Sequence, residues 1–275
     1  MSRFLSSKLL SRTLLVLTLV LLGLNFLPLE VNIYRVRAVP GEKFDTTLSK
    51  ELRSIDELLA RTDAEARKAN AAPGSLEYAL VLNGILENRF HQGYSTYRLS
   101  QNWVAALSGW IKRDYAAVVI PDDLMKFPEA SCSQQSLVAM EALRRKGYDV
   151  RKVIFTSHFA SEVRVGDRWY FLDANMEPPM TAANAADITT IAAPDYCHNL
   201  YHGVFTLHAF HKNFRRKIEV GPVNERIAAN VTRFHQAGFW LSKTAFLLPL
   251  ALLTALYFYR RSRTTARPGS GSLTT

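Results

Sequence analysis

Apolar and polar positions divide this chain of 275 residues into three regions. An apolar run covers 14–29, with Thr18 and Asn25 as its only polar side chains, and a second run covers 245–259. The stretch between the runs mixes apolar and polar positions at helix and strand spacings. Because about 20 apolar residues in a helix cross a bilayer, the runs predict two membrane spans. The stretch between them, of roughly 200 residues, is long enough for a domain with its own core.

The predicted spans are 13–31 and 239–259. The second reaches full length if Lys243 extends to the interface, and Trp240 is placed as interfacial aromatics are. Two alternatives stay open. The first run also has the basic start and apolar centre of a cleaved signal peptide, although no small-x-small cleavage site follows it. The second run also has the composition of a buried core helix.

The region between the spans predicts helices first and strands afterwards. Helical spacing indicates helices at 44–70, 76–88, 101–112 and 131–146, and β-rich runs indicate strands at 149–156, 158–165 and 168–174. This order, several helices followed by an antiparallel meander, is typical of the α+β class.

The helix at 131–146 has clear signals at both ends. Ser131 and Gln134 form an S-x-x-Q capping box, and Gly147 supplies the stop. A face of small and apolar side chains begins at Cys132, so we expect this helix at the centre of the domain.

A two-residue turn at 166–167 sets the register of the two strands beside it. Continued outward, the register places His158, Asp173 and Asn175 on one face, with Asp173 diagonal to His158. An imidazole and a carboxylate at that spacing can form a hydrogen bond. A slip of one residue would separate them.

The net charge of +10 is concentrated at the ends of the chain. Seven positive charges lie in the tails 1–12 and 260–275, which contain no acidic residue. The positive-inside rule then predicts cytoplasmic tails and an extracytoplasmic domain at 32–238, with the protein in the inner (cytoplasmic) membrane and the domain in the periplasm. The domain is almost neutral, so the charge gives no support for a nucleic-acid partner.

Cys132, His158 and Asp173 form the strongest candidate constellation. The first turn of a helix favours a thiolate through its unpaired N–H groups and dipole. A thiolate beside a histidine that a carboxylate orients is the arrangement of nucleophilic acyl transfer. The Cys132 backbone N–H is then a candidate oxyanion donor.

These residues resemble the transglutaminase-like superfamily of papain-like cysteine enzymes, in a bacterial membrane-anchored type. The resemblance covers roughly 125–180 and rests on Ser131-Cys132-Ser133-Gln134-Gln135-Ser136, Lys146-Gly147-Tyr148, His158-x-x-x-Glu162-Val163 and Arg168-Trp169-Tyr170-Phe171-Leu172-Asp173. It implies a central helix that carries the cysteine and packs on an antiparallel sheet. It also implies hydrolysis of a peptide or amide, or acyl transfer, without a cofactor and on a peptide or protein substrate. Cys132 would be the nucleophile, His158 the base and Asp173 the orienting group.

The chain departs from the family pattern at three places. Many members have Gly before the cysteine, Trp two residues after the histidine and Pro after the aspartate, where this chain has Ser131, Ala160 and Ala174. The departures keep a second hypothesis open, in which an inactive module of this fold binds or builds a cell-envelope assembly with partner proteins.

Further side chains are secondary candidates. Papain-like sites take an extra oxyanion donor from upstream, for which Gln101, Asn102 and Trp103 are candidates, although a capped helix with Trp103 in the core fits as well. Asn175 is a candidate to share the orienting role.

Histidines and cysteines outside this constellation suggest two other kinds of site. The metal candidates are His198, His202, His208 and His211, whose i,i+4 and i,i+3 spacings suit a metal, although surface histidines would give the same spacings. The two cysteines, Cys132 and Cys197, also allow a disulfide, which would exclude a catalytic thiol.

Overall fold

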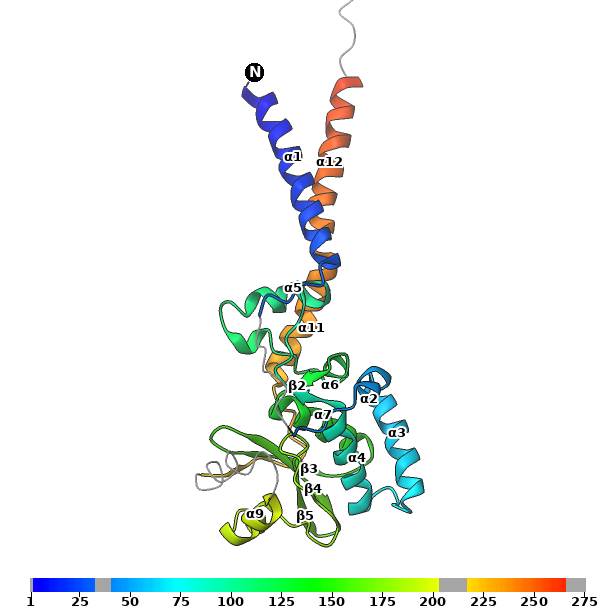
Figure 1. The fold of residues 1–275 in the computed structure, drawn as a ribbon. Coiled ribbons are helices and arrows are strands. Elements are labelled where there is room, and N and C mark those ends of the chain that lie inside the picture. Colours follow the sequence, from blue (N-terminus) through cyan, green and yellow to red (C-terminus); the bar gives the residue numbers. More distant parts are fainter. Residues whose placement is uncertain (1, 33–40, 203–216, 266–275) are drawn as a thin grey trace, which may run out of the picture. The chain divides into compact units, whose positions relative to one another are not determined.

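The computed structural model describes residues 2–32, 41–202 and 217–265 and has an α+β fold (Figure 1). The chain forms two compact units. Unit 1 comprises 1–32, 97–116 and 233–275, and unit 2 comprises 33–96 and 117–232. The sequence prediction assigned 97–116 to the extracytoplasmic domain, whereas in the structure this segment clusters with the apolar helices.

Unit 1 is helical. Its elements are α1 (Ser2–Gly23), η1 (Leu24–Phe26), α5 (Leu99–Ser108), η2 (Arg113–Tyr115), most of α11 (Ala229–Thr244) and α12 (Leu247–Thr265). The apolar helices α1 and α12 pack against each other. Two segments, Lys8–Phe26 and Ala229–Arg263, are long and apolar enough to cross a membrane, and few of their side chains are buried inside the protein.

Unit 2 contains the remaining helices and both sheets. The helices are α2 (Thr46–Glu51), α3 (Ile55–Lys68), α4 (Leu76–Arg89), α6 (Pro121–Leu124), α7 (Cys132–Arg145), α8 (Ile188–Ile191) and α9 (Pro194–Tyr201). The helix predicted at 44–70 is thus two helices. Each helix has its own cap: Asp45 caps α2, and Ser54 begins α3 by accepting the backbone N–H of Glu57.

The main sheet is antiparallel, with strand order β5-β4-β3-β6. Its strands are β3 (Val150–Ile154), β4 (Phe159–Val165), β5 (Arg168–Leu172) and β6 (Glu219–Val220). Val165 pairs with Arg168 and Ser161 with Leu172, so the predicted hairpin register is confirmed. Gly166 has φ +58°, which suits the first position of a two-residue hairpin turn. A small parallel sheet joins β1 (His91–Gln92) to β2 (Glu129–Ala130), directly before α7.

Helix α7 packs against β3 and β4 and forms part of the core of unit 2. The predicted capping box is present: Gln134 Oε1 accepts the Ser131 backbone N–H at 3.1 Å. Gly147, at φ +85°, ends the helix as predicted. Val138 and Leu143 are fully buried. These signals are local in sequence, which explains why the helix was predictable.

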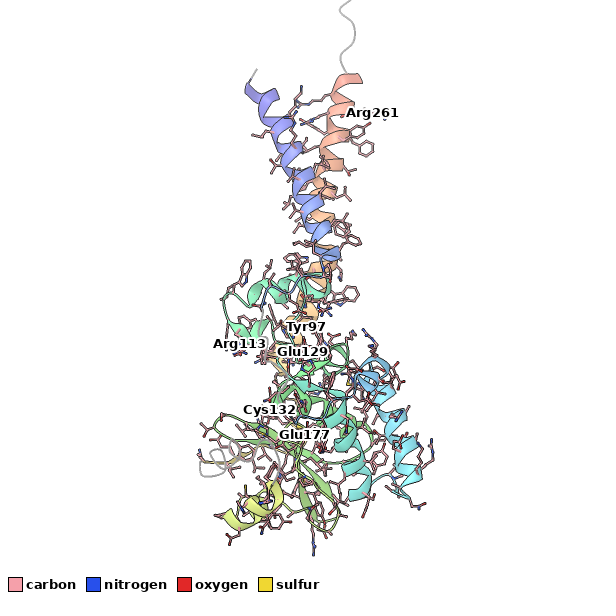
Figure 2. The ribbon with its side chains drawn as sticks, in the orientation of Figure 1. Tyr97, Arg113, Glu129, Cys132, Glu177 and Arg261 are labelled. Carbon is pink, nitrogen blue, oxygen red and sulfur yellow. The ribbon has the colours of Figure 1, made fainter. Side chains whose placement is uncertain are left out.

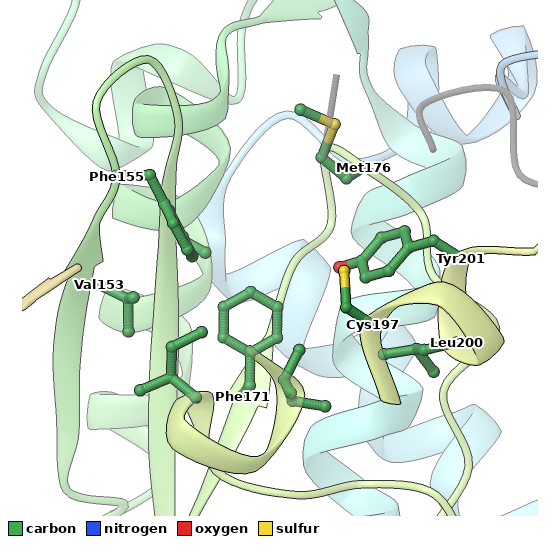
Figure 3. Close-up of a cluster of buried hydrophobic side chains, with 10 residues drawn as sticks. Val153, Phe155, Phe171, Met176, Cys197, Leu200 and Tyr201 are labelled. Atoms are coloured by element: carbon green, nitrogen blue, oxygen red, sulfur yellow. The ribbon is translucent and has the colours of Figure 1, made fainter. Parts of the chain in front are cut away.

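A second buried cluster holds the short helices α8 and α9 to the sheet (Figure 3). Phe171 of β5 lies at its centre, and Cys197 and Tyr201 of α9 lie on one side of it. Strand residues of this cluster, such as Val153, alternate along β3 with Val150, which is buried on the opposite face. The sheet therefore has apolar cover on both faces, and the ends of β4 and β5 are held in place.

Candidate active site

Three elements of unit 2 bring the predicted catalytic residues together. Cys132 is the first residue of α7, His158 directly precedes β4, and Asp173 directly follows β5. The paired ends of β4 and β5 lie next to each other in the observed register, and α7 packs on β4. The hairpin thus places the imidazole beside the carboxylate, and the helix start lies close to both.

His158 and Asp173 form a buried hydrogen-bonded pair. His158 Nε2 lies 2.9 Å from Asp173 Oδ2, and each side chain is only 1% exposed. The other oxygen, Asp173 Oδ1, accepts the backbone N–H groups of Asn175 and Met176, both at 3.2 Å. The carboxylate is therefore fixed by its own following turn and in turn fixes the imidazole.

The thiol of Cys132 is the second partner of His158, through a side-chain hydrogen bond and an electrostatic interaction. Burial alone lowers the pKa of His158, but the Asp173 carboxylate and Cys132 outweigh it and raise this pKa to about 10. Asp173 uses Nε2, so Nδ1 is the ring nitrogen left for the thiol. An imidazolium is the partner that stabilises a thiolate. Since Cys132 is also partly exposed, a reagent can reach its sulfur.

Buried acidic side chains near Asp173 were not foreseen from the sequence. Glu87 of α4 and the Tyr201 hydroxyl both interact electrostatically with Asp173. Glu177, labelled with Cys132 in Figure 2, accepts the Lys43 backbone N–H at 3.0 Å. Lys43 Nζ in turn lies 2.9 Å from Glu87 Oε2.

These two glutamates are costly to ionise. Burial raises the pKa of Glu177 to about 7, although its contact with Lys43 lowers it. Burial likewise raises the pKa of Glu87. Glu177 also has a left-handed backbone with φ +51°. Its only signal in the sequence is an acidic residue before two prolines, which indicates a turn and not a buried carboxyl group.

Asn175 is buried next to Asp173, but its observed role differs from the one proposed from the sequence. Its backbone N–H, and not its side chain, holds Asp173. Among the described residues its Nδ2 has no hydrogen-bond partner. The Asn175 amide can therefore still donate a hydrogen bond next to His158 and Asp173.

The upstream candidates Gln101, Asn102 and Trp103 belong to α5 in unit 1. The side chain of Gln101 accepts the Arg98 N–H at 2.9 Å. Asn102 Nδ2 donates to the His235 carbonyl, and Trp103 Nε1 donates to the Ser242 carbonyl. These groups thus have partners inside unit 1, and the bonds of Asn102 and Trp103 join α5 to α11.

The metal and disulfide alternatives have little support in the structure. The rings of His198 and His202 lie 5.7 Å apart, centroid to centroid, whereas His208 and His211 lie outside the described residues. Within the described ranges, no three His, Cys, Asp or Glu side chains are grouped as a metal site requires.

Both cysteines are free thiols. Cys197 is almost fully buried, and burial raises its pKa to about 11. It is therefore a packing residue of the Phe171 cluster, in contrast to the partly exposed Cys132.

Comparisons with known proteins add no family to this geometry. No protein-family model matches the chain, and no match was found among curated proteins or solved structures. The function must therefore be argued from Cys132, His158 and Asp173 and from the elements that hold them.

Proposed function

We propose that this protein is a membrane-anchored cysteine enzyme of transglutaminase-like type, which hydrolyses a peptide or amide or transfers its acyl group. The observation that supports it is His158, which contacts Asp173 at 2.9 Å and hydrogen-bonds Cys132 at the start of α7. A structural cysteine and a surface histidine have no need of this linked, buried arrangement.

The chemistry follows from the positions of the three groups. The Cys132 thiolate attacks the carbonyl carbon of the substrate, and a bond forms between Sγ and that carbon. The protonated His158 gives its proton to the leaving amine as the carbon–nitrogen bond breaks. Water or an acceptor amine then attacks the thioester, loses a proton to His158 and releases Cys132. Asp173 holds the ring and stabilises its charged form in both steps.

The membrane location of this site is part of the proposal. The apolar segments of α1 and of α11–α12 support two spans. The basic tails favour cytoplasmic ends and unit 2 on the opposite side, in the periplasm of a bacterial inner membrane. A papain-like core, with α7 as the central helix on the antiparallel sheet, is consistent with this function.

An activated acyl ester tests the proposal without knowledge of the substrate. With p-nitrophenyl acetate, the full-length protein in detergent should release a burst of about one equivalent of nitrophenolate and carry an acetyl group on Cys132. Cys132→Ser should lose the burst, and Cys197→Ala should keep it. A folded wild-type protein with no acetyl group on Cys132 would refute the enzyme and favour the binding or structural module.

A further inference from the structure

Beyond its first residue, helix α5 buries no large apolar side chain. Its buried residues are Leu99, at its start, and then Asn102, Ala105 and Ala106, which are polar or small. Trp103 and Leu107 are only partly buried. In the turn that continues the helix, Trp110 is 71% exposed and Ile111 is 85% exposed.

These four side chains are spaced to lie on one side of a helix. Trp103, Leu107, Trp110 and Ile111 follow one another at i, i+4, i+7 and i+8. The turn keeps helical hydrogen bonds, from Trp110 N to Leu107 O and from Ile111 N to Ser108 O. A water-soluble protein places such a stripe toward its core, whereas here Trp103 and Leu107 are partly exposed and Trp110 and Ile111 face outward.

The start of α5 is fixed at the end of the first candidate span, which ends at Phe26. The backbone N–H of Leu99 donates to Leu29 O at 3.0 Å, and that of Ser100 donates to Leu27 O at 2.9 Å. Figure 1 shows α5 running across the C-terminal end of α1 within unit 1.

A layer of polar contacts marks the same level on the second candidate span. Lys243 Nζ donates to Asn25 Oδ1 at 3.1 Å and to Ser100 O at 2.7 Å. Asn25 Nδ2 donates to Ser242 O at 3.0 Å, and Trp103 Nε1 donates to the same carbonyl. In helices that span a bilayer, charged and amide groups avoid the hydrocarbon and favour its boundary. For the proposed spans, this layer would place helix α5 level with the membrane–water interface.

The turn after α5 is held rigidly, so its exposed side chains are presented in a fixed position. Asn32 Nδ2 donates to Ala106 O at 2.7 Å. A Cβ on Gly109 would lie 2.5 Å from Asn32 Oδ1 and 2.6 Å from the Ala116 Cβ, so only glycine fits there.

We propose that the outer face of α5 and its turn, Trp103, Leu107, Trp110 and Ile111, lies in the headgroup region of the bilayer as a third membrane contact. Indole and aliphatic side chains favour this region, and the exposed Lys112 can reach lipid phosphates. The bilayer is favoured over a protein partner because the stripe continues the exposed apolar surface of the spans, which includes Phe26, Leu27 and Trp240. The inference rests on the proposed membrane location of α1 and α12.

Quenching of tryptophan fluorescence by brominated lipids tests this contact. The chain has four tryptophans, so three variants that each keep one of Trp110, Trp240 or Trp169 provide a matched set, with Phe at the others. Trp240 on α11 reports insertion of the span, and Trp169 on β5 reports the aqueous domain. The protein is reconstituted into phosphatidylcholine–phosphatidylglycerol vesicles with bromines either near the headgroups or deep in the acyl chains.

We expect shallow bromines to quench Trp110 at least twice as strongly as Trp169, and more strongly than deep bromines do. Quenching of Trp240 without quenching of Trp110 would overturn this inference and leave the spans intact. Quenching of neither would refute the membrane location itself. Protection of Trp110 from both bromine and aqueous iodide would mean that a second copy or another protein covers α5, and would also overturn the inference. If the triple substitutions do not fold, Trp110→Phe in the otherwise unchanged protein gives the same comparison by loss of the quenchable signal.

Discussion

The raised pKa of His158 is the main electrostatic feature of the candidate site. Its pKa of about 10 in the folded protein lies above the value of about 6.5 expected for an unfolded chain. The protonated ring therefore stabilises the fold most fully below pH 6.5, and this contribution is lost as the pH rises toward 10. At neutral pH the ring is charged and lies between a carboxylate and a thiol.

Asp173→Asn should remove the charge that holds His158 protonated and should keep the shape of the site. The asparagine oxygen can still accept the N–H groups of Asn175 and Met176, so the turn should persist. Loss of the carboxylate removes the largest influence that raises the pKa of His158. We expect the pKa of His158 to fall by at least about one unit, which NMR titration of labelled histidine measures. The turnover of an acyl ester should fall about 10²–10⁴-fold. An unchanged titration of His158 would contradict the pairing.

Glu177 makes a separate prediction about stability and pH. Its pKa is raised to about 7 in the folded state, so the folded protein holds a proton that the unfolded chain loses near pH 4.5. The wild-type protein should therefore lose stability as the pH rises from about 4.5 to 7. Glu177→Gln should remove this loss and be more stable at pH 8 by an amount on the order of 1–3 kcal/mol. Urea unfolding at pH 5 and pH 8 gives the measurement, and an equal difference at both values would disprove the assignment.

The catalytic candidates were predictable from the sequence and their acidic neighbours were not. Cys132, His158 and Asp173 each lie at the end of an element with local signals, and a two-residue turn fixes the register between two of them. Glu87 and Tyr201 approach Asp173 from α4 and α9, which are far apart in sequence. No periodicity or turn signal reports a contact of that kind.

For helices and strands, boundaries set by local sequence signals were predicted correctly, and a boundary set by a distant contact was not. The β4–β5 hairpin and α7 follow from a turn glycine, a capping box and a stop glycine. The helix at 44–70 was wrong as one element, because the chain breaks at Leu52 to meet a distant side chain. That side chain is Arg89 at the end of α4, whose Nε donates to Leu52 O at 2.8 Å.

Arg89 joins this break to the segment that leads into α7. It is fully buried and also donates to Phe127 O at 2.9 Å and to Met125 O at 2.5 Å. Burial lowers its pKa to about 10, so it remains charged at neutral pH. Arg89→Met would leave these carbonyl groups buried without a donor and should cost about 3 kcal/mol or more.

A matched control for this substitution lies on α3. Arg61 is exposed and pairs with Glu65 at 3.1 Å, so Arg61→Met should change the stability by less than about 0.5 kcal/mol. Both variants are compared by urea unfolding at pH 7. Equal stability of the two would mean that Arg89 does not hold α2, α4 and the segment before β2 together.

For the whole molecule, the two apolar helices and the basic tails make a prediction about topology. Both ends should be cytoplasmic. An alkaline phosphatase fusion, which is active only outside the cytoplasm, should be inactive at either terminus of the full chain. Inserted into the exposed hairpin turn at 166–167 of unit 2, it should be active. An active fusion at the C-terminus would contradict two spans with cytoplasmic ends.

The reactivity of Cys132 across pH tests the central claim most directly. Iodoacetamide labelling of the full-length protein between pH 5 and 9, read by mass spectrometry, reports Cys132 and Cys197 separately. With His158 charged and bonded to the thiol, Cys132 should react at pH 6.5 at least tenfold faster than in His158→Gln, while the buried Cys197 stays unlabelled in both. Equal rates for Cys132 in the wild-type protein and in His158→Gln would show that the thiol is not activated and would contradict the proposed enzyme.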